Sequence, residues 1–170
     1  KNIDLLLNLS ASPYTFKKFK SRNEISSFAA KYLKVPLIYI NQVGANDDLI
    51  FDGNSFIINK NGSKIKQLES FSEDSSTCDI NENSNLVIKN ESCEISSVFD
   101  ALVLGVKDYA KKCGFRSALI GLSGGVDSAL VSVIATAALG SENIYCVSMP
   151  SKWSSQHSKT DAKDLVERLN

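Results

Sequence analysis

The residues best suited to chemistry in this chain lie between positions 119 and 131. An apolar strand pattern ends at residues 123–125 (Ser-Gly-Gly), and a helical apolar pattern begins at Asp127. Glycines let the backbone turn sharply and approach a ligand closely, because they carry no Cβ. Free N–H groups of such a turn and of the first helical turn converge on one point, with the helix dipole behind them. With hydroxyl groups at Ser123 and Ser128, the run predicts a loop that binds pyrophosphate.

The spacing excludes two other nucleotide-binding loops. A Walker A loop requires a lysine after its last glycine, and no lysine follows Gly125. The Gly-x-Gly-x-x-Gly fingerprint of dinucleotide-binding folds is also missing. Residues 123–128 instead match Ser-Gly-Gly-x-Asp-Ser at all six positions, and the run resembles the signature of the ATP pyrophosphatase (PP-loop) family. A strand-to-helix turn without a ligand is the structural alternative.

The PP-loop resemblance implies chemistry on ATP. Enzymes of this family cleave ATP between the α- and β-phosphates and adenylate an oxygen, which ammonia or another nucleophile then displaces. Asp127 is expected to act near the metal, because Mg²⁺ prefers carboxylate oxygen. The implied ATP-binding residues are Gly121, Leu122, Ser123, Gly124, Gly125, Val126, Asp127 and Ser128.

A second group of candidate residues follows the first apolar strand. Residues 8–14 read Asn-Leu-Ser-Ala-Ser-Pro-Tyr, with Lys18 shortly beyond, and alone they indicate only a strand ending in a turn. Residues 36–44 and 47–56, however, resemble the C-terminal half of a nitrilase-type domain. Such a half followed by a PP-loop half is the architecture of the glutamine-dependent NAD⁺ synthetase family. Residues 149–158 are similar to that family's Met-Pro-Ser-x-x-Ser-Ser-x-His-Ser segment.

This resemblance implies a ligase of NAD biosynthesis with two reactions. A cysteine thiolate releases ammonia from glutamine, aided by a glutamate base and a lysine. With Mg²⁺, ATP adenylates the carboxylate of deamido-NAD⁺, pyrophosphate leaves, and ammonia displaces AMP to give NAD⁺. The family positions that match Ser12 and Lys18 hold glutamine, and a hydroxyl beside an ammonium suits an amino-acid carboxylate.

The chain departs from the family pattern at the glutaminase site. The nucleophilic cysteine and its partners are expected upstream of the first strand, so no catalytic residue is assigned within this chain. Cys78 and Cys93 fall in a polar segment without a basic partner, and nothing there activates a thiol. Lys1 opens the chain and Met149 is the only methionine. We therefore expect an interior segment of a longer protein, with half of each active site.

Composition limits the remaining classes of function. The 170 residues are 43% hydrophobic and 22% charged with a net charge of +0, which is typical of a soluble domain and argues against a nucleic-acid partner. No apolar stretch approaches the ~18 residues that a membrane span requires. No Cys-x-x-Cys pair occurs, so zinc and redox motifs are unsupported and a cytoplasmic location is expected. A homo-oligomer is the expected assembly.

The predicted fold is α/β. Residues 1–70 are assigned to the C-terminal part of a nitrilase-like α-β-β-α sandwich and 71–93 to a linker. Residues 94–170 are assigned to the N-terminal part of a doubly wound parallel-sheet ATP pyrophosphatase (adenine nucleotide α-hydrolase-like) domain. The predicted strands are 4–9, 36–41, 49–58, 63–69, 86–89, 116–122 and 142–149. Asn61-Gly62 predicts a hairpin between the third and fourth of these.

Helical spacing of apolar residues predicts the helices that support both candidate sites. One apolar face carries Ile25, Phe28, Ala29, Tyr32 and Leu33. Another, beginning at Ile95 and stopped by Gly114, carries Phe99, Leu102, Val106 and Tyr109. Ser158, with Asp161 three residues on, resembles a capping box at the start of the last helix.

Other features receive structural interpretations. His157 without a partner defines no catalytic site, Trp153 is expected to pack on its own domain, and the adjacent Asp47 and Asp48 indicate a solvated turn. Two alternatives for function remain. Another PP-loop enzyme, such as a tRNA-modifying or GMP-forming ligase, would share residues 121–128 but is not expected to carry a nitrilase half. A non-catalytic fragment would bind ATP weakly or assemble with a partner.

Overall fold

The computed structural model describes residues 3–80, 94–153 and 155–169, so Cys93 and the predicted strand 86–89 lie outside it. The chain divides into two compact units, residues 1–101 and 102–170. Both units contain helices and strands, and each contains a parallel strand pair connected through a helix, in agreement with the predicted α/β class. Over the described residues, no helix is both long and apolar enough to cross a bilayer.

The first unit is built on a four-stranded mixed sheet of order β1-β2-β5-β6. Strands β1 (Leu6–Ser10) and β2 (Leu37–Asn41) are parallel, and helix α1 (Lys18–Leu33) connects them. Strands β5 (Phe56–Ile58) and β6 (Lys64–Gln67) continue the sheet as an antiparallel hairpin. That hairpin confirms the prediction made from Asn61-Gly62, since Gly62 has a φ of 80° that glycine adopts without strain.

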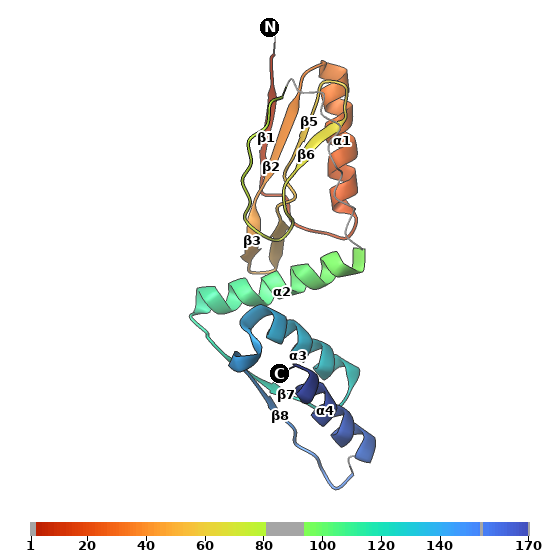
Figure 1. The fold of residues 1–170 in the computed structure, drawn as a ribbon, viewed down its shortest axis with the longest axis vertical. Helices are drawn as coiled ribbons and strands as arrows, with labels where there is room; N and C mark the ends of the chain where they lie inside the picture. The colour runs from red at the N-terminus through yellow and green to blue at the C-terminus, as the bar shows by residue number, and fades with distance from the viewer. Residues whose placement is uncertain (1–2, 81–93, 154, 170) are drawn as a thin grey trace. The chain divides into compact units, whose positions relative to one another are not determined.

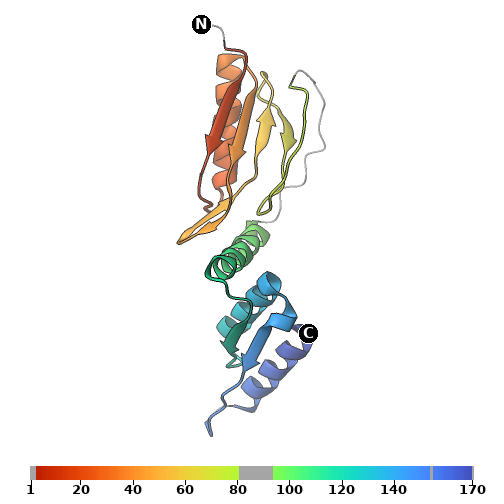
Figure 2. The ribbon, with the colours of Figure 1, turned by 90° about the vertical axis from the view of Figure 1, so that its left-hand side faces the viewer.

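Helix α1 covers one face of this sheet, as Figure 2 shows, but it does so with an unexpected side. The residues it buries are Arg22, Ser26 and Ala30, whereas Phe28 is 71% and Tyr32 76% exposed. Small side chains at positions 26 and 30 let the helix approach the sheet closely, and Ala30 is fully buried. The helix is present as predicted, but most of its predicted apolar face is exposed, and Ala29 is the member of that face that packs against the core. The core consists of Ala30, Leu37, Tyr39, Phe56 and Ile58, with Leu6, Phe19 and Ala29 packed against it.

The predicted strand 49–58 is two strands in the structure. Strand β4 (Leu49–Asp52) pairs with β3 (Val43–Asn46), which was not predicted, and β5 begins only at Phe56. Between them Gly53 and Asn54 have φ values of 61° and 52°, which interrupt the extended backbone. Asp47 and Asp48 form the turn between β3 and β4, as expected.

The second unit contains a β-α-β-α progression. Parallel strands β7 (Ala118–Gly121) and β8 (Ile144–Val147) are connected by helix α3 (Val126–Leu139) and a short 3-10 helix, η1 (Ser141–Asn143). Helix α3 contacts both strands and also helix α4 (Gln156–Leu169), as Figure 1 shows. Helix α2 (Glu94–Cys113) precedes β7 and contains the boundary between the two units. It ends at Gly114, which has a φ of 74°, as the sequence predicted.

Helix α4 begins earlier than its predicted cap. Its first residue is Gln156, and the Ser155 hydroxyl accepts a hydrogen bond from the Ser158 N–H at 3.1 Å. Ser155 therefore occupies the capping position, and Ser158 lies in the first helical turn. The prediction that Ser158 caps this helix was wrong by three residues.

Candidate functional site

The first candidate site is the connection between β7 and α3. The chain leaves the strand at Gly121, turns at residues 123–125, and enters the helix at Val126. Gly124 has a φ of 82°, and a Cβ on it would overlap the backbone carbonyl of Ser158. Glycine is required there for two reasons, the left-handed backbone and the close approach of α4. The predicted nucleotide loop thus has the strand–turn–helix context that such a motif needs.

Two of the loop amides expected to be free are hydrogen-bonded to serine hydroxyls. The Ser123 N–H donates to the Ser128 Oγ at 3.3 Å, and the Gly125 N–H donates to the Ser123 Oγ at 3.2 Å. Among the described residues, the N–H groups of Gly124, Val126 and Asp127 have no such acceptor. The two serine bonds are exposed and close to the upper distance limit, so an anion with stronger acceptor oxygens can replace them.

A pocket of about 190 Å³ adjoins this loop. It is lined by Gly121, Leu122 and Ser123 from the predicted ATP site, with Val147, Ser148, Met149, Pro150, Ser158 and Lys159. Lys159 was missed by the sequence analysis, although its place beside Ser158 in the 149–158 segment could have drawn attention to it. A lysine that lines this pocket supplies a cation beside a loop suited to phosphate.

Asp127 lies in the first turn of α3 and is exposed. No group of three or more His, Cys, Asp or Glu residues able to hold a metal occurs in the part of the chain that the structure describes. A Mg²⁺ ion at Asp127 would therefore need phosphate oxygens as its other ligands. Magnesium is commonly bound in this way, by one or two carboxylates together with the phosphates of a substrate.

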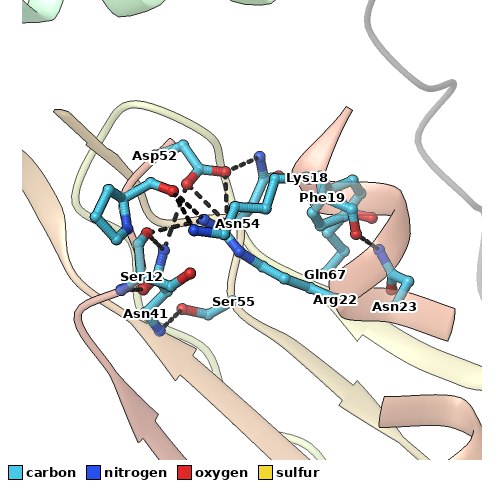
Figure 3. A network of polar contacts seen from close by, with 11 residues as sticks. Ser12, Lys18, Phe19, Arg22, Asn23, Asn41, Asp52, Asn54, Ser55 and Gln67 are labelled. Atoms are coloured by element: carbon cyan, nitrogen blue, oxygen red, sulfur yellow. Dashed lines mark hydrogen bonds and ion pairs between the residues drawn. The ribbon is translucent and has the colours of Figure 1, made fainter. Parts of the chain in front are cut away.

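The second candidate site is the turn after β1. The Lys18 ammonium donates to the Pro13 carbonyl at 3.0 Å, so the structure brings Lys18 and Ser12, the two predicted glutamine contacts, to the same turn. The side chain of Asn41 binds the backbone of Ser12. The Asn41 Oδ1 accepts from the Ser12 N–H at 2.8 Å, and the Asn41 Nδ2 donates to the Ser12 carbonyl at 3.2 Å. Figure 3 shows this network.

A buried ion pair that the sequence analysis missed supports this turn. Arg22 and Asp52 are only 6% and 1% exposed, and Arg22 Nη1 lies 2.7 and 2.9 Å from the two Asp52 oxygens. Arg22 is not among the residues of the predicted apolar face, and no local pattern links it to Asp52. Burial and the Asp52 carboxylate also raise the pKa of the nearby Tyr14 phenol, which favours its neutral form.

Asp52→Ala is expected to destabilise the first unit by about 3–5 kcal/mol, because it leaves the buried Arg22 charge without its partner. Urea unfolding followed by circular dichroism measures this change. Asp48→Ala removes an exposed carboxylate of the same unit and should alter stability by about 0.5 kcal/mol or less. Similar losses in the two variants would contradict the view that Asp52 compensates the buried charge of Arg22.

The remaining chemically notable residues have no place in either site. Trp153 is 84% exposed and its ring lies beside Lys152, so the expectation that it packs on its own domain was wrong. His157 is exposed in the first turn of α4. Cys78, Cys113 and Cys146 are free thiols.

Comparison with known proteins gives a consistent result. Residues 98–170 match the family model described as NAD synthase. The chain is 46% identical to the glutamine-dependent NAD(+) synthetase of Synechocystis sp. over 99% of its own length, and 40% identical to that of Rhodobacter capsulatus over 98%. It spans 31% of the length of each of these relatives.

Solved structures agree with the sequence comparison. The chain matches the glutamine-dependent NAD+ synthetase from Acinetobacter baumannii in complex with ADP, with a TM-score of 0.85 and 36% identity. The match covers 99% of this chain and 33% of that one. A glutamine-dependent NAD(+) synthetase from Cytophaga hutchinsonii gives a TM-score of 0.79 at 19% identity and supports the fold.

Proposed function

We propose that this chain, which is similar to glutamine-dependent NAD(+) synthetases, is part of a protein that amidates deamido-NAD⁺ to NAD⁺ with consumption of ATP. Residues 121–128 bind ATP and direct cleavage between its α- and β-phosphates. Residues around Ser12 and Lys18 bind the glutamine that supplies ammonia. The observation that carries the proposal is the loop at residues 123–128. Its glycine turn packs against α4, and the N–H groups of Gly124, Val126 and Asp127 have no acceptor among the described residues.

The loop acts on the departing pyrophosphate. Negative charge develops on the β-phosphate as the bond to the α-phosphate breaks, and the N–H groups at the start of α3 stabilise it. The Ser123 and Gly125 N–H groups, which donate to serine hydroxyls in this structure, donate to phosphate oxygens instead. The hydroxyls of Ser123 and Ser128 also donate to phosphate oxygens. Lys159, which lines the pocket, adds a positive charge. The ADP-bound A. baumannii relative supports an adenine nucleotide as the ligand of this fold.

Asp127 is the residue that would hold Mg²⁺, shared with the phosphate oxygens of ATP. The ion would neutralise charge on the phosphates during adenylation of the deamido-NAD⁺ carboxylate. Without the ion, the Asp127 carboxylate beside the same phosphates would repel them. Because Asp127 favours ATP when the ion is bound and repels it otherwise, ATP binding and metal binding depend on each other at this position.

The glutamine-binding half is proposed to be part of a nitrilase-like sandwich covering residues 1–70. Helix α1 covers one face of the β1-β2-β5-β6 sheet. The opposite face carries Leu7, Leu9 and Ile40, which are exposed in this chain. An apolar second face is what a sandwich of packed sheets requires, since both faces of its sheets are covered. The linker at 71–93 and the synthetase half at 94–170 complete the proposed organisation.

The products of ATP turnover test this function directly. Full-length protein supplied with glutamine, ATP, Mg²⁺ and deamido-NAD⁺ should form NAD⁺, AMP and pyrophosphate in equal amounts. Chromatography of the nucleotides and an enzymatic pyrophosphate assay measure these products. ADP and phosphate as the products would reject the PP-loop assignment. Turnover without any dependence on deamido-NAD⁺ would favour another PP-loop ligase.

Lys18→Ala is expected to raise the KM for glutamine by about tenfold or more, because an ammonium–carboxylate contact contributes about 1.5–3 kcal/mol. Activity with ammonia as nitrogen donor should stay at the wild-type level. Initial rates with each donor measure the difference, with the exposed Lys20→Ala on the same helix as the control. Equal losses with both donors would count against Lys18 as a glutamine contact.

A further inference from the structure

The guanidinium of Arg22 is buried, although removing such a charged group from water costs free energy. Its guanidinium is desolvated with Asp52, and its Nε has no hydrogen-bond partner among the described residues. Replacing a buried ion pair with well-packed apolar side chains is often neutral or stabilising, so such a pair is weak evidence for a contribution to stability. The geometry of the second guanidinium nitrogen indicates a different use for this residue.

Arg22 Nη2 binds the turn that carries the proposed glutamine contacts. It donates to the Ser12 carbonyl at 2.8 Å and to the Pro13 carbonyl at 3.1 Å, while Nη1 is occupied by Asp52. The planar guanidinium therefore joins a fixed carboxylate on β4 to two successive carbonyls of the turn. A planar fork of donors holds such groups in one geometry, which the single ammonium of a lysine does not reproduce.

The same carbonyls control the two groups that face the ligand. The Pro13 carbonyl accepts from Lys18 as well as from Arg22, so its position sets the position of the Lys18 ammonium. The backbone of Ser12 is held by Arg22 and Asn41, whereas the Ser12 hydroxyl makes no hydrogen bond to another residue in the described ranges. The hydroxyl and two of the three ammonium donors thus remain available.

We propose that Arg22, fixed by Asp52, is a positioning residue that holds the turn at Ser12 and Pro13 so that the Ser12 hydroxyl and the Lys18 ammonium engage one glutamine molecule. The inference rests on the proposed function, and it adds the residue that sets the geometry of the glutamine site. Asp52 also neutralises Arg22, which leaves Lys18 as the cation presented to the substrate carboxylate.

Arg22→Lys tests this role in the full-length protein. Lysine keeps a positive charge for Asp52 but loses the contacts to the Ser12 and Pro13 carbonyls. We expect the KM for glutamine to rise about tenfold, equivalent to ~1.4 kcal/mol of binding free energy, while kcat and KM with ammonia stay unchanged. Isothermal titration with glutamine should show the same loss of affinity. Arg22→Met, which removes the charge, is the second variant and should show at least the same loss.

Gln67→Ala provides the matched control within the same network. Gln67 donates to Asn54, which in turn donates to Asp52, and in the described part of the chain neither residue has a hydrogen bond to Ser12 or Pro13. Its KM for glutamine should stay at the wild-type value. A wild-type KM for glutamine in Arg22→Lys, or an equal rise in Gln67→Ala, overturns the positioning role. Wild-type protein that makes NAD⁺ from neither donor overturns the proposed function instead, so the two failures are distinct.

Discussion

Gly124→Ala is expected to reduce formation of AMP and pyrophosphate to about 1% of the wild-type rate or less. The added Cβ overlaps the Ser158 carbonyl, a main-chain group that cannot rotate away, and the φ of 82° is unfavourable for alanine. The loop must therefore open or α4 must shift, and either change moves the N–H groups at the start of α3. Misplacing one preorganised donor typically costs 10²–10³-fold in rate. Quantifying pyrophosphate release under saturating ATP measures the loss.

Gly114→Ala separates the clash from the backbone strain. Gly114 also has a positive φ, 74°, but a Cβ there meets no atom within 4 Å. This variant should cost only about 1–2 kcal/mol of stability and keep its ATP turnover. Full activity in Gly124→Ala would mean that the loop does not bind the departing phosphates. Equal loss in both variants would attribute the effect to destabilised folding.

Asp127→Ala is expected to abolish formation of AMP and pyrophosphate, with a loss of at least about 100-fold in kcat. The variant lacks the only carboxylate in the first turn of α3, so the proposed Mg²⁺ site loses its protein ligand beside the phosphates. Glutamine binding should be unchanged, because Ser12 and Lys18 belong to the other unit. Rate measurements across a Mg²⁺ titration, paired with glutamine calorimetry, test both parts.

Asp164→Ala, which removes an exposed carboxylate from α4, controls for a general loss of negative charge and should keep the wild-type rate. Asp127→Asn keeps the size of the side chain but weakens its affinity for the ion, and its activity should recover in part at high Mg²⁺. A wild-type Mg²⁺ dependence in Asp127→Ala would remove this residue from the metal site.

Local signals made parts of this structure predictable from sequence. The loop at 123–128, the Asn61-Gly62 turn and the end of α2 at Gly114 each depend on glycines whose backbone requirement is set within a few residues. The same rule explains a failure. The positive φ values of Gly53 and Asn54 divide the predicted strand 49–58, although the apolar residues around them suggested one continuous strand.

Long-range interactions account for the features that could not be predicted. Arg22 and Asp52 are 30 residues apart, and nothing near either residue indicates that they pair in the interior. The side of α1 that carries this arginine also buries Ser26 and Ala30, whereas most of the apolar stripe is exposed. Periodicity identified the helix correctly but could not identify which side would be buried.

The close approach of Gly124 to the Ser158 carbonyl has a consequence for mutational mapping of the proposed nucleotide site. Both partners in that contact are main-chain atoms, so exchanging the side chain at position 158 leaves the contact in place. Alanine scanning would therefore report the first turn of α4 as dispensable, although the main chain of that turn packs directly against the loop. Insertions or deletions between β8 and α4 displace the helix itself, and they would reveal the contribution of this main-chain contact.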